Sequence, residues 1–334
     1  MRKYIEDKEK RELSQYAQCS FDSAGRKYEE EKCDFRTCFQ RDRDRIIHSK
    51  AFRRLKHKTQ VFIAPEGDHY RTRLTHTLEV SQIARTIARS LRLNEDLTEA
   101  ISLGHDLGHT PFGHAGEAAI NEVCDGEFSH NKQSLRVVEV LEKRKKEIPG
   151  LNLTKEVRDG IANHTGQNKP ETLEGCIVRI ADRIAYINHD IDDALRAGLI
   201  ELIDLPQEAL EVLGETHSQR IDTMVRDMIN KSMKKSEIKR GKKVYKATQQ
   251  LRKFLFDNIY FGSLAKSEEE KAKRLIKLLY DFYKNNPDRL PKEFIKGTNE
   301  DIEQIIIDYI AGMSDRYAIK VGKDIYIPEP WFVK

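Results

Sequence analysis

Histidines placed on helical faces constrain this chain more than any other feature. Between residues 73 and 91, apolar side chains recur at the three- and four-residue spacing of one helical face, at Val80, Ile83, Ala84, Ile87, Ala88 and Leu91. His76 lies one turn before Val80 on that face, so its imidazole is predicted to point into the protein. A single inward histidine is usually a satisfied core residue, so this position alone predicts no chemistry.

A second helix is predicted to follow and to end in a histidine and an aspartate. Asn94 can cap its start, and Gly108 can end it. Its inward face has the spacing i, i+4, i+7, i+8 and consists of Leu97, Ile101, Gly104 and His105. Asp106 follows His105 directly. A buried carboxylate costs several kcal/mol unless a cation or a hydrogen bond compensates it, so the adjacent imidazole and carboxylate favour a site for a divalent metal.

A third helical segment, within residues 171–198, offers a further oxygen ligand. Its apolar face is formed by Ile177, Ile180, Ala181, Ile184 and Ile191. A polar stripe beside that face contains Asp182, Tyr186, His189, Asp190 and Asp193. Such a stripe is commonly solvated surface. Asp182, however, lies next to the apolar positions and can instead face the two histidines.

The order of these residues resembles a known metal motif. His76, His105 with Asp106, and Asp182 match the H…HD…D pattern of HD-domain phosphohydrolases. Five surrounding segments, 35–62, 105–117, 159–166, 181–198 and 312–318, look like the deoxyguanosinetriphosphate triphosphohydrolase family, and the likeness spans most of the chain. The resemblance implies an all-α HD-domain fold with additional C-terminal helices, and a divalent ion (Mg, Mn, Fe, Co or Ni) held by the four motif residues. It also implies hydrolysis of deoxynucleoside triphosphates (dNTPs), dGTP among them, to deoxynucleoside and inorganic triphosphate.

The same resemblance implies roles for residues that bind the substrate. Gln60 corresponds to a glutamine that approaches the sugar, and Arg73 to an arginine that contacts phosphate. Arg183, Tyr186 and Asp190 correspond to contacts with the triphosphate, the sugar and the 3′-hydroxyl. A tyrosine ring under C2′ leaves no room for a 2′-hydroxyl and so rejects ribonucleotides.

Candidates for proton transfer follow the His-Asp pair. After Pro111, where a new helix can begin, His114 and Glu117 lie three residues apart on one face, where a carboxylate can orient an imidazole. Related enzymes use a histidine and an acid here to position the attacking water, and the sequence leaves open whether His109 or His114 has that role. His130 is expected either to donate a proton to the leaving group or to lie in a helix-capping turn. His164 is expected in a loop near the pocket and has no assigned role.

We expect a polar N-terminal arm (1–34), a catalytic core (35–200) and a C-terminal helical region packed on the core (201–334). Arginines between residues 36 and 54 alternate with acids, which predicts either ion-paired surface or, with Lys56 and Lys58, a polyphosphate pocket. The lysine-rich segment 231–246 is expected to be a solvated loop, or a contact for an effector nucleotide or single-stranded nucleic acid, with Tyr245 to stack.

Composition excludes little. The 334 residues are 38% hydrophobic and 34% charged, and a net charge of +4 neither requires nor excludes a nucleic-acid partner. Five cysteines without a Cys-x-x-Cys pair predict reduced packing residues. With no membrane-spanning run and no signal-peptide core, we expect a cytoplasmic protein. The resemblance implies a homo-oligomer, and the sequence leaves open whether a dNTP also acts as an allosteric effector. The alternatives are another HD phosphohydrolase, such as a nucleotidase or phosphodiesterase, or a nucleotide- or nucleic-acid-binding protein with a vestigial site.

Overall fold

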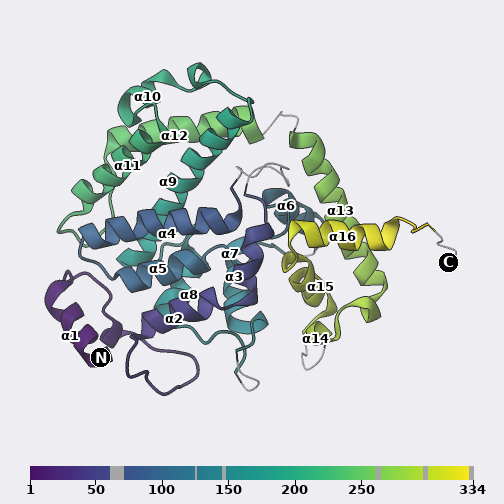
Figure 1. The fold of residues 1–334 in the computed structure, drawn as a ribbon, viewed down its shortest axis with the longest axis horizontal. Helices are drawn as coiled ribbons and strands as arrows, with labels where there is room; N and C mark the ends of the chain where they lie inside the picture. Colours follow the sequence, from purple (N-terminus) through teal and green to yellow (C-terminus); the bar gives the residue numbers. More distant parts are fainter. Residues whose placement is uncertain (61–70, 125, 145–147, 261–264, 296–299, 331–334) are drawn as a thin grey trace.

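The computed structural model describes residues 1–60, 71–124, 126–144, 148–260, 265–295 and 300–330. These ranges contain helices and three isolated β-bridges, and no strand is assigned within them, so the all-α prediction is confirmed (Figure 1). None of the helices in these ranges is both long enough and apolar enough to cross a membrane.

The helices of the described ranges follow one another with connections of very different length, the longest being residues 13–37 between α1 and α2. In the first half of the chain they are α1 (Arg2–Glu12), α2 (Cys38–Ile47), α3 (Lys50–Arg54), α4 (Arg73–Ser90), α5 (Glu95–Gly104), α6 (His114–Val123), α7 (His130–Arg136) and α8 (Lys155–Asn163). In the second half they are α9 (Leu173–Arg196), α10 (Gln207–Leu213), α11 (His217–Ser232), α12 (Lys242–Leu255), α13 (Ala265–Asn285), α14 (Lys292–Ile295), α15 (Ile302–Ala311) and α16 (Asp315–Tyr326). Six single turns of 3₁₀ or π type supplement them.

Local signals in the sequence set the starts of the two helices that carry the first histidines. The Thr72 side chain caps α4 by accepting from the backbone N–H of Thr75, and Asn94 caps α5 by accepting from Leu97. The predicted stop at Gly108 is wrong, because α5 ends four residues earlier, at Gly104. The residues that follow bond to α7 instead: the Ser134 hydroxyl donates to the His105 carbonyl and accepts from the Gly108 N–H.

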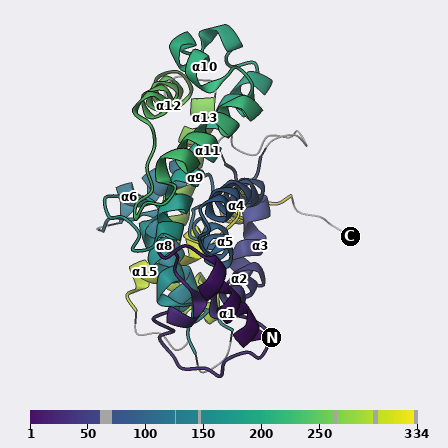
Figure 2. The same cartoon turned by 90° about the vertical axis from the view of Figure 1, so that its left-hand side faces the viewer.

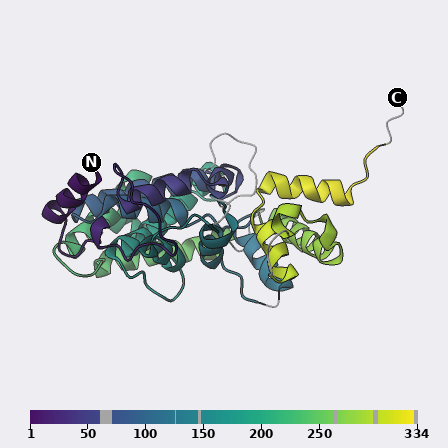
Figure 3. The ribbon, with the colours of Figure 1, turned by 90° about the horizontal axis from the view of Figure 1, so that it is seen from below.

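Two apolar cores organise these helices. The first contains α4, α5 and α9, with α2 and α8 on one side and α10 to α12 on the other. The second contains α13, α15, α16 and the apolar side of α6. Figures 1 and 3 show α13 to α16 gathered at one side of the molecule. The boundary between the cores falls near residue 260, so residues 201–260 pack with the expected catalytic core and not with the C-terminal helices.

The N-terminal segment is ordered against the first core. α1 lies at the opposite end of the molecule from α10 (Figure 2). The buried carboxylate of Glu9 accepts from the Ser20 backbone N–H at 2.7 Å and from the Ser20 hydroxyl at 2.8 Å. Residues 1–34, expected to be an arm or an irregular lead-in, therefore begin with a helix whose inner face is fastened by hydrogen bonds.

Candidate active site

The four residues of the predicted metal motif come together from three helices. His76 lies in α4, His105 and Asp106 lie at the end of α5, and Asp182 lies in α9. One ligand atom each from His76, His105 and Asp106 lies within 4.8 Å of the others. Asp182 completes the cluster, since its Oδ1 is 3.1 Å from His76 Nε2 and 3.7 Å from His105 Nε2. We refer to these four residues as the metal cluster.

The hydrogen bonds around His105 fit a metal ligand. Its Nδ1 lies 2.6 Å from the carbonyl oxygen of Ser102, and a carbonyl only accepts, so Nδ1 carries a proton and Nε2 is the nitrogen that can bind a metal ion. Nε2 is buried and has no hydrogen bond among the described residues; it lies 3.6 Å from Asp106 Oδ1 and 3.7 Å from Asp182 Oδ1. A lone pair that faces two carboxylate oxygens needs a cation between them, and a divalent metal ion meets that need.

Charges within the metal cluster support this arrangement. Burial opposes ionisation of Asp106, but His105 and Arg73 outweigh it and hold the pKa of this carboxyl well below its usual range. Burial also lowers the pKa of His105, but Asp106 and Asp182 outweigh it and raise that pKa to about 9. A proton and a metal ion therefore compete for the same nitrogen of His105.

The residues expected to bind substrate surround this cluster. Arg73 is buried and donates to Asp106 Oδ2 at 2.8 Å, so in this structure it holds a motif carboxylate. The Oε1 atom of Gln60 is buried and has no hydrogen-bond partner in the described part of the chain. Arg183 and Tyr186 are half-buried on α9, and Asp190 is buried.

The polar stripe of α9 is not solvated. His189, Asp190 and Asp193 are buried, because α4 and α11 pack on this helix. The Nδ1 of His189 lies 3.4 Å from the Nδ1 of His76, and Arg71 pairs with Asp193 at 2.8 Å. The interpretation of this stripe as surface is therefore wrong.

A second group of ring nitrogens and a carboxylate adjoins the metal cluster. We call it the relay cluster, and it consists of His109, His114, Glu117 and His130. The carboxylate of Glu117 accepts from the backbone N–H of His130 at 3.0 Å, and its Oε2 lies 3.2 Å from His130 Nδ1. The same Oε2 lies 3.8 Å from Nδ1 of His114, whose side chain is 81% exposed. His130 is the first residue of α7, after the N-cap Ser129, and its role in proton transfer stays a prediction.

His109 differs from His114 in its surroundings. It is buried, its Nε2 lies 3.7 Å from Asp106 Oδ1, and its Nδ1 has no hydrogen bond in the described residues. Its ring stacks on that of His130, with centroids 4.1 Å apart and planes 13° from parallel. One nitrogen of each ring and an oxygen of Asp106 lie close enough to suggest another metal site. A metal bound to two imidazoles lies near the plane of both, which stacked rings do not allow, so we assign the metal to the first cluster.

The structure corrects the expected role of several cations. Arg36, Arg43 and Arg45 form ion pairs with Asp44, with Asp96 and Glu99, and with Glu30, so they do not line a phosphate pocket. Lys58 is buried, and burial lowers its pKa to about 7. Its ammonium group donates to the carbonyl of His109 and, at 2.8 Å, to that of Ala311.

Two buried residues have roles that the sequence did not reveal. Asp315 begins α16 and accepts from the backbone N–H groups of Thr59 at 2.9 Å and Phe112 at 3.0 Å, which fastens α16 to both loops beside the metal cluster. The other is His164, the C-cap residue of α8, which is buried. No apolar periodicity marks Asp315 or His164, because they contact segments that are distant in the sequence.

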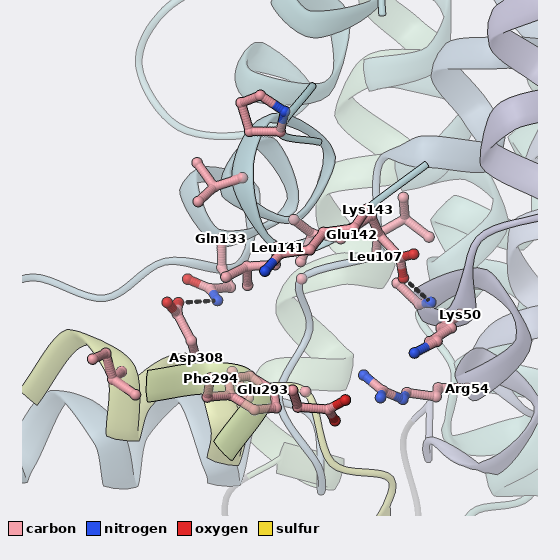
Figure 4. Close-up of a pocket in the computed structure, with 18 of the residues that line it drawn as sticks. Lys50, Arg54, Leu107, Gln133, Leu141, Glu142, Lys143, Glu293, Phe294 and Asp308 are labelled. Atoms are coloured by element: carbon pink, nitrogen blue, oxygen red, sulfur yellow. Dashed lines mark hydrogen bonds between the residues drawn. The ribbon is translucent and has the colours of Figure 1, made fainter. Parts of the chain in front are cut away.

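A cavity of about 470 Å³ lies apart from both clusters, between α3, α7, α14 and α15 (Figure 4). Lys50 and Arg54 lie at one end of it, and Asp308 accepts from Gln133 at 2.9 Å near the other. Within the described chain, the predicted metal ligands and proton-transfer residues do not line it, and neither do Gln60, Arg73, Arg183, Tyr186 and Asp190. Arg54 and Lys58, which were expected in either an ion-paired surface or a polyphosphate pocket, do line it. The predicted metal and proton-transfer chemistry therefore lies outside this cavity.

Comparisons with known proteins agree with this geometry. The HD domain model matches residues 73–187, which include all four metal-cluster residues, and the phosphohydrolase-associated domain model matches residues 238–324. A solved phosphohydrolase from Bacteroides thetaiotaomicron VPI-5482 is 18% identical with a TM-score of 0.53, and the match covers 85% of this chain and 68% of that one. This likeness shows the fold alone.

Sequence relatives are much closer. A deoxyguanosinetriphosphate triphosphohydrolase-like protein from Caldanaerobacter subterraneus subsp. tengcongensis is 61% identical over 99% of this chain and 97% of the relative. One from Clostridium tetani is 49% identical over 98% of this chain and 97% of the relative. The chain therefore belongs to the deoxyguanosinetriphosphate triphosphohydrolase-like family of HD-domain phosphohydrolases.

Proposed function

We propose that this chain is a metal-dependent dNTP triphosphohydrolase, which converts deoxynucleoside triphosphates, dGTP among them, to deoxynucleoside and inorganic triphosphate. The observation that carries the proposal is the convergence of two imidazoles and two carboxylates on one point, with the lone pair of His105 Nε2 aimed at it. The names of the close relatives support the choice of substrate.

The reaction adds water to the α-phosphorus and breaks its bond to the 5′-oxygen, which takes up a proton. His76, His105, Asp106 and Asp182 would hold a divalent ion (Mg, Mn, Fe, Co or Ni), which lowers the pKa of bound water and polarises a phosphate oxygen. We assign proton transfer to His114, oriented by Glu117, because its ring is exposed to an incoming substrate while His109 is buried.

Residues on the other sides of the metal cluster would provide affinity and selectivity. Arg73 and Arg183 would offset phosphate charge, and Asp190 would accept from the 3′-hydroxyl. Gln60 and the ring of Tyr186 would contact the sugar and exclude ribonucleotides. A dNTP effector, single-stranded nucleic acid at 231–246, a homo-oligomer and a cytoplasmic location stay predictions.

The test combines elemental analysis of the purified protein with incubation against the four dNTPs and the four ribonucleotides. Ion-exchange separation should show triphosphate and deoxynucleoside in equal amounts. Pyrophosphate or orthophosphate would indicate a different HD phosphohydrolase. Binding of dNTP without turnover, in protein loaded with metal, would indicate a nucleotide-binding protein.

A further inference from the structure

His164 lies against both clusters and belongs to neither. It follows α8 directly as the C-cap residue, and its side chain is buried. Its ring contacts that of His105, with centroids 5.0 Å apart, and that of His130, with centroids 5.2 Å apart. A buried polar ring in this position needs partners for both nitrogens.

Those partners fix where the proton of His164 lies. Its Nδ1 is 2.7 Å from the carbonyl oxygen of Ile161, which only accepts a hydrogen bond, so Nδ1 carries the proton. Its Nε2 is 3.2 Å from the Nε2 of His130. One proton lies between two hydrogen-bonded ring nitrogens. Since His164 already carries its proton on Nδ1, the proton between the rings belongs to His130 Nε2.

The second nitrogen of His130 faces an acceptor as well. His130 Nδ1 lies 3.2 and 3.4 Å from the two oxygens of Glu117, and the backbone N–H of His130 donates to the same carboxylate. Glu117 in turn lies beside His114. With a proton on each ring nitrogen of His130, donors and acceptors alternate from the Ile161 carbonyl through His164 and His130 to Glu117.

We propose that His164 is a positioning residue for the hydrolysis proposed above. By accepting from His130 Nε2 it holds that ring in one orientation, which directs Nδ1 at Glu117 and keeps the carboxylate turned toward His114. His164 touches no substrate in this arrangement. The consequence for catalysis rests on the proposed function, whereas the hydrogen bonds from Ile161 to Glu117 stand without it.

Three substitutions separate this role from a purely structural one. His164→Asn keeps a group that can donate to the Ile161 carbonyl but removes the acceptor that faces His130. His164→Gln extends an amide oxygen toward His130, and His164→Leu removes both contacts. We expect kcat for dGTP to fall roughly ten- to a hundredfold in the Asn and Leu variants, with KM and metal content unchanged, and to recover most of that loss in the Gln variant.

Ile161→Val is the matched control, because it trims a buried side chain at the same end of α8 and leaves the carbonyl in place. Equal losses in all three His164 variants and in this control would overturn the proposal, because they would indicate lost packing. A rise in KM at constant kcat would also overturn it.

A second readout does not depend on activity. Ring ¹⁵N spectra of histidine-labelled protein, assigned with a His130→Gln variant, report the protons on His130. In the wild-type protein His130 Nε2 should be protonated, and the signals of both ring nitrogens should move in His164→Asn. Unchanged His130 signals would overturn the inference whatever the rates. If the wild-type protein hydrolysed no dNTP, the proposed function would fail while this spectrum still tested the hydrogen bonds.

Discussion

The metal cluster and the relay cluster lie side by side and use the same residue types, but their hydrogen bonds are arranged in opposite ways. Along the path from the Ile161 carbonyl through His164 and His130 to Glu117, donors alternate with acceptors, so protons alone satisfy these contacts. In the metal cluster, the lone pair of His105 faces two carboxylate oxygens, and no hydrogen bond satisfies it. The first pattern is complete by itself, and the second needs a cation.

This difference shows how a metal site can be distinguished from a hydrogen-bonded group of histidines and carboxylates. By distance alone, Asp106, His109 and His130 form a possible metal site as readily as the motif residues do. The two groups are told apart by asking which ring nitrogen carries a proton and what the other nitrogen faces. We expect four results that test these assignments.

Removing His105 should abolish both metal binding and hydrolysis. We expect His105→Ala to lose the bound metal and to lower kcat/KM for dGTP by at least about a thousandfold, because the ion supplies several kcal/mol of transition-state stabilisation. Elemental analysis and steady-state kinetics measure the two effects. His48→Ala, at an exposed histidine, is the control. Hydrolysis that persists in metal-free His105→Ala would remove the basis of the assignment.

Glu117→Gln should separate the two clusters. The amide can no longer attract the proton of His114, so we expect kcat to fall roughly a hundredfold while the metal content stays at the wild-type level. Glu122→Gln changes an exposed acid on the same helix and should have no effect on either quantity. Loss of metal in Glu117→Gln would show that the clusters are a single unit.

Glu174 tests the effect of burial on the pKa of a carboxyl group that belongs to neither cluster. One of its oxygens accepts from the backbone N–H groups of Gln18 and Asn94, the other has no hydrogen bond in the described chain, and burial raises its pKa to about 7. A raised folded-state pKa stabilises the protein below the unfolded value of 4.5, and that contribution is lost as pH rises through about 7.

Denaturant unfolding of Glu174→Gln and wild type at pH 5 and pH 8 measures this effect. Relative to wild type, the variant should gain on the order of 2 kcal/mol between the two pH values, because its amide never ionises. Parallel pH profiles for the two proteins would contradict the expectation.

Tyr186 tests the sugar contact, which neither cluster provides. Truncation in Tyr186→Ala opens space beside C2′, so the ratio of kcat/KM for dGTP over GTP should fall by about tenfold. Tyr4→Ala, at an exposed tyrosine of α1, should keep the wild-type ratio. An unchanged ratio in Tyr186→Ala would assign the exclusion of ribonucleotides elsewhere.

The sequence predicts the parts of this site that depend on local structure. Apolar periodicity and caps locate α4 and α5, and with them the inward direction of His76 and His105. The contact between Asp182 and the two histidines was expected from the family motif, and the distances agree with it.

The other features of the site depend mainly on contacts between segments that are distant in the sequence. Periodicity shows which face of α9 is polar, but not that α4 and α11 cover it, so the burial of His189 and Asp193 was missed. His164 lies in the loop after α8, as expected, but its contacts with His105 and His130 were not predicted, and neither were the backbone contacts of Lys58. The partners of Lys58, the carbonyls of His109 and Ala311, are backbone atoms of distant segments, which the sequence pattern does not mark.

Lys58 also ties the two apolar cores together mechanically. Its single ammonium group bridges the end of α15, at Ala311, and the loop that carries His109. The C-terminal helices therefore cannot shift without either displacing that loop or leaving a buried cation with an unused donor. A contact that moves α15 therefore also displaces the loop that carries His109, beside the proposed catalytic residues.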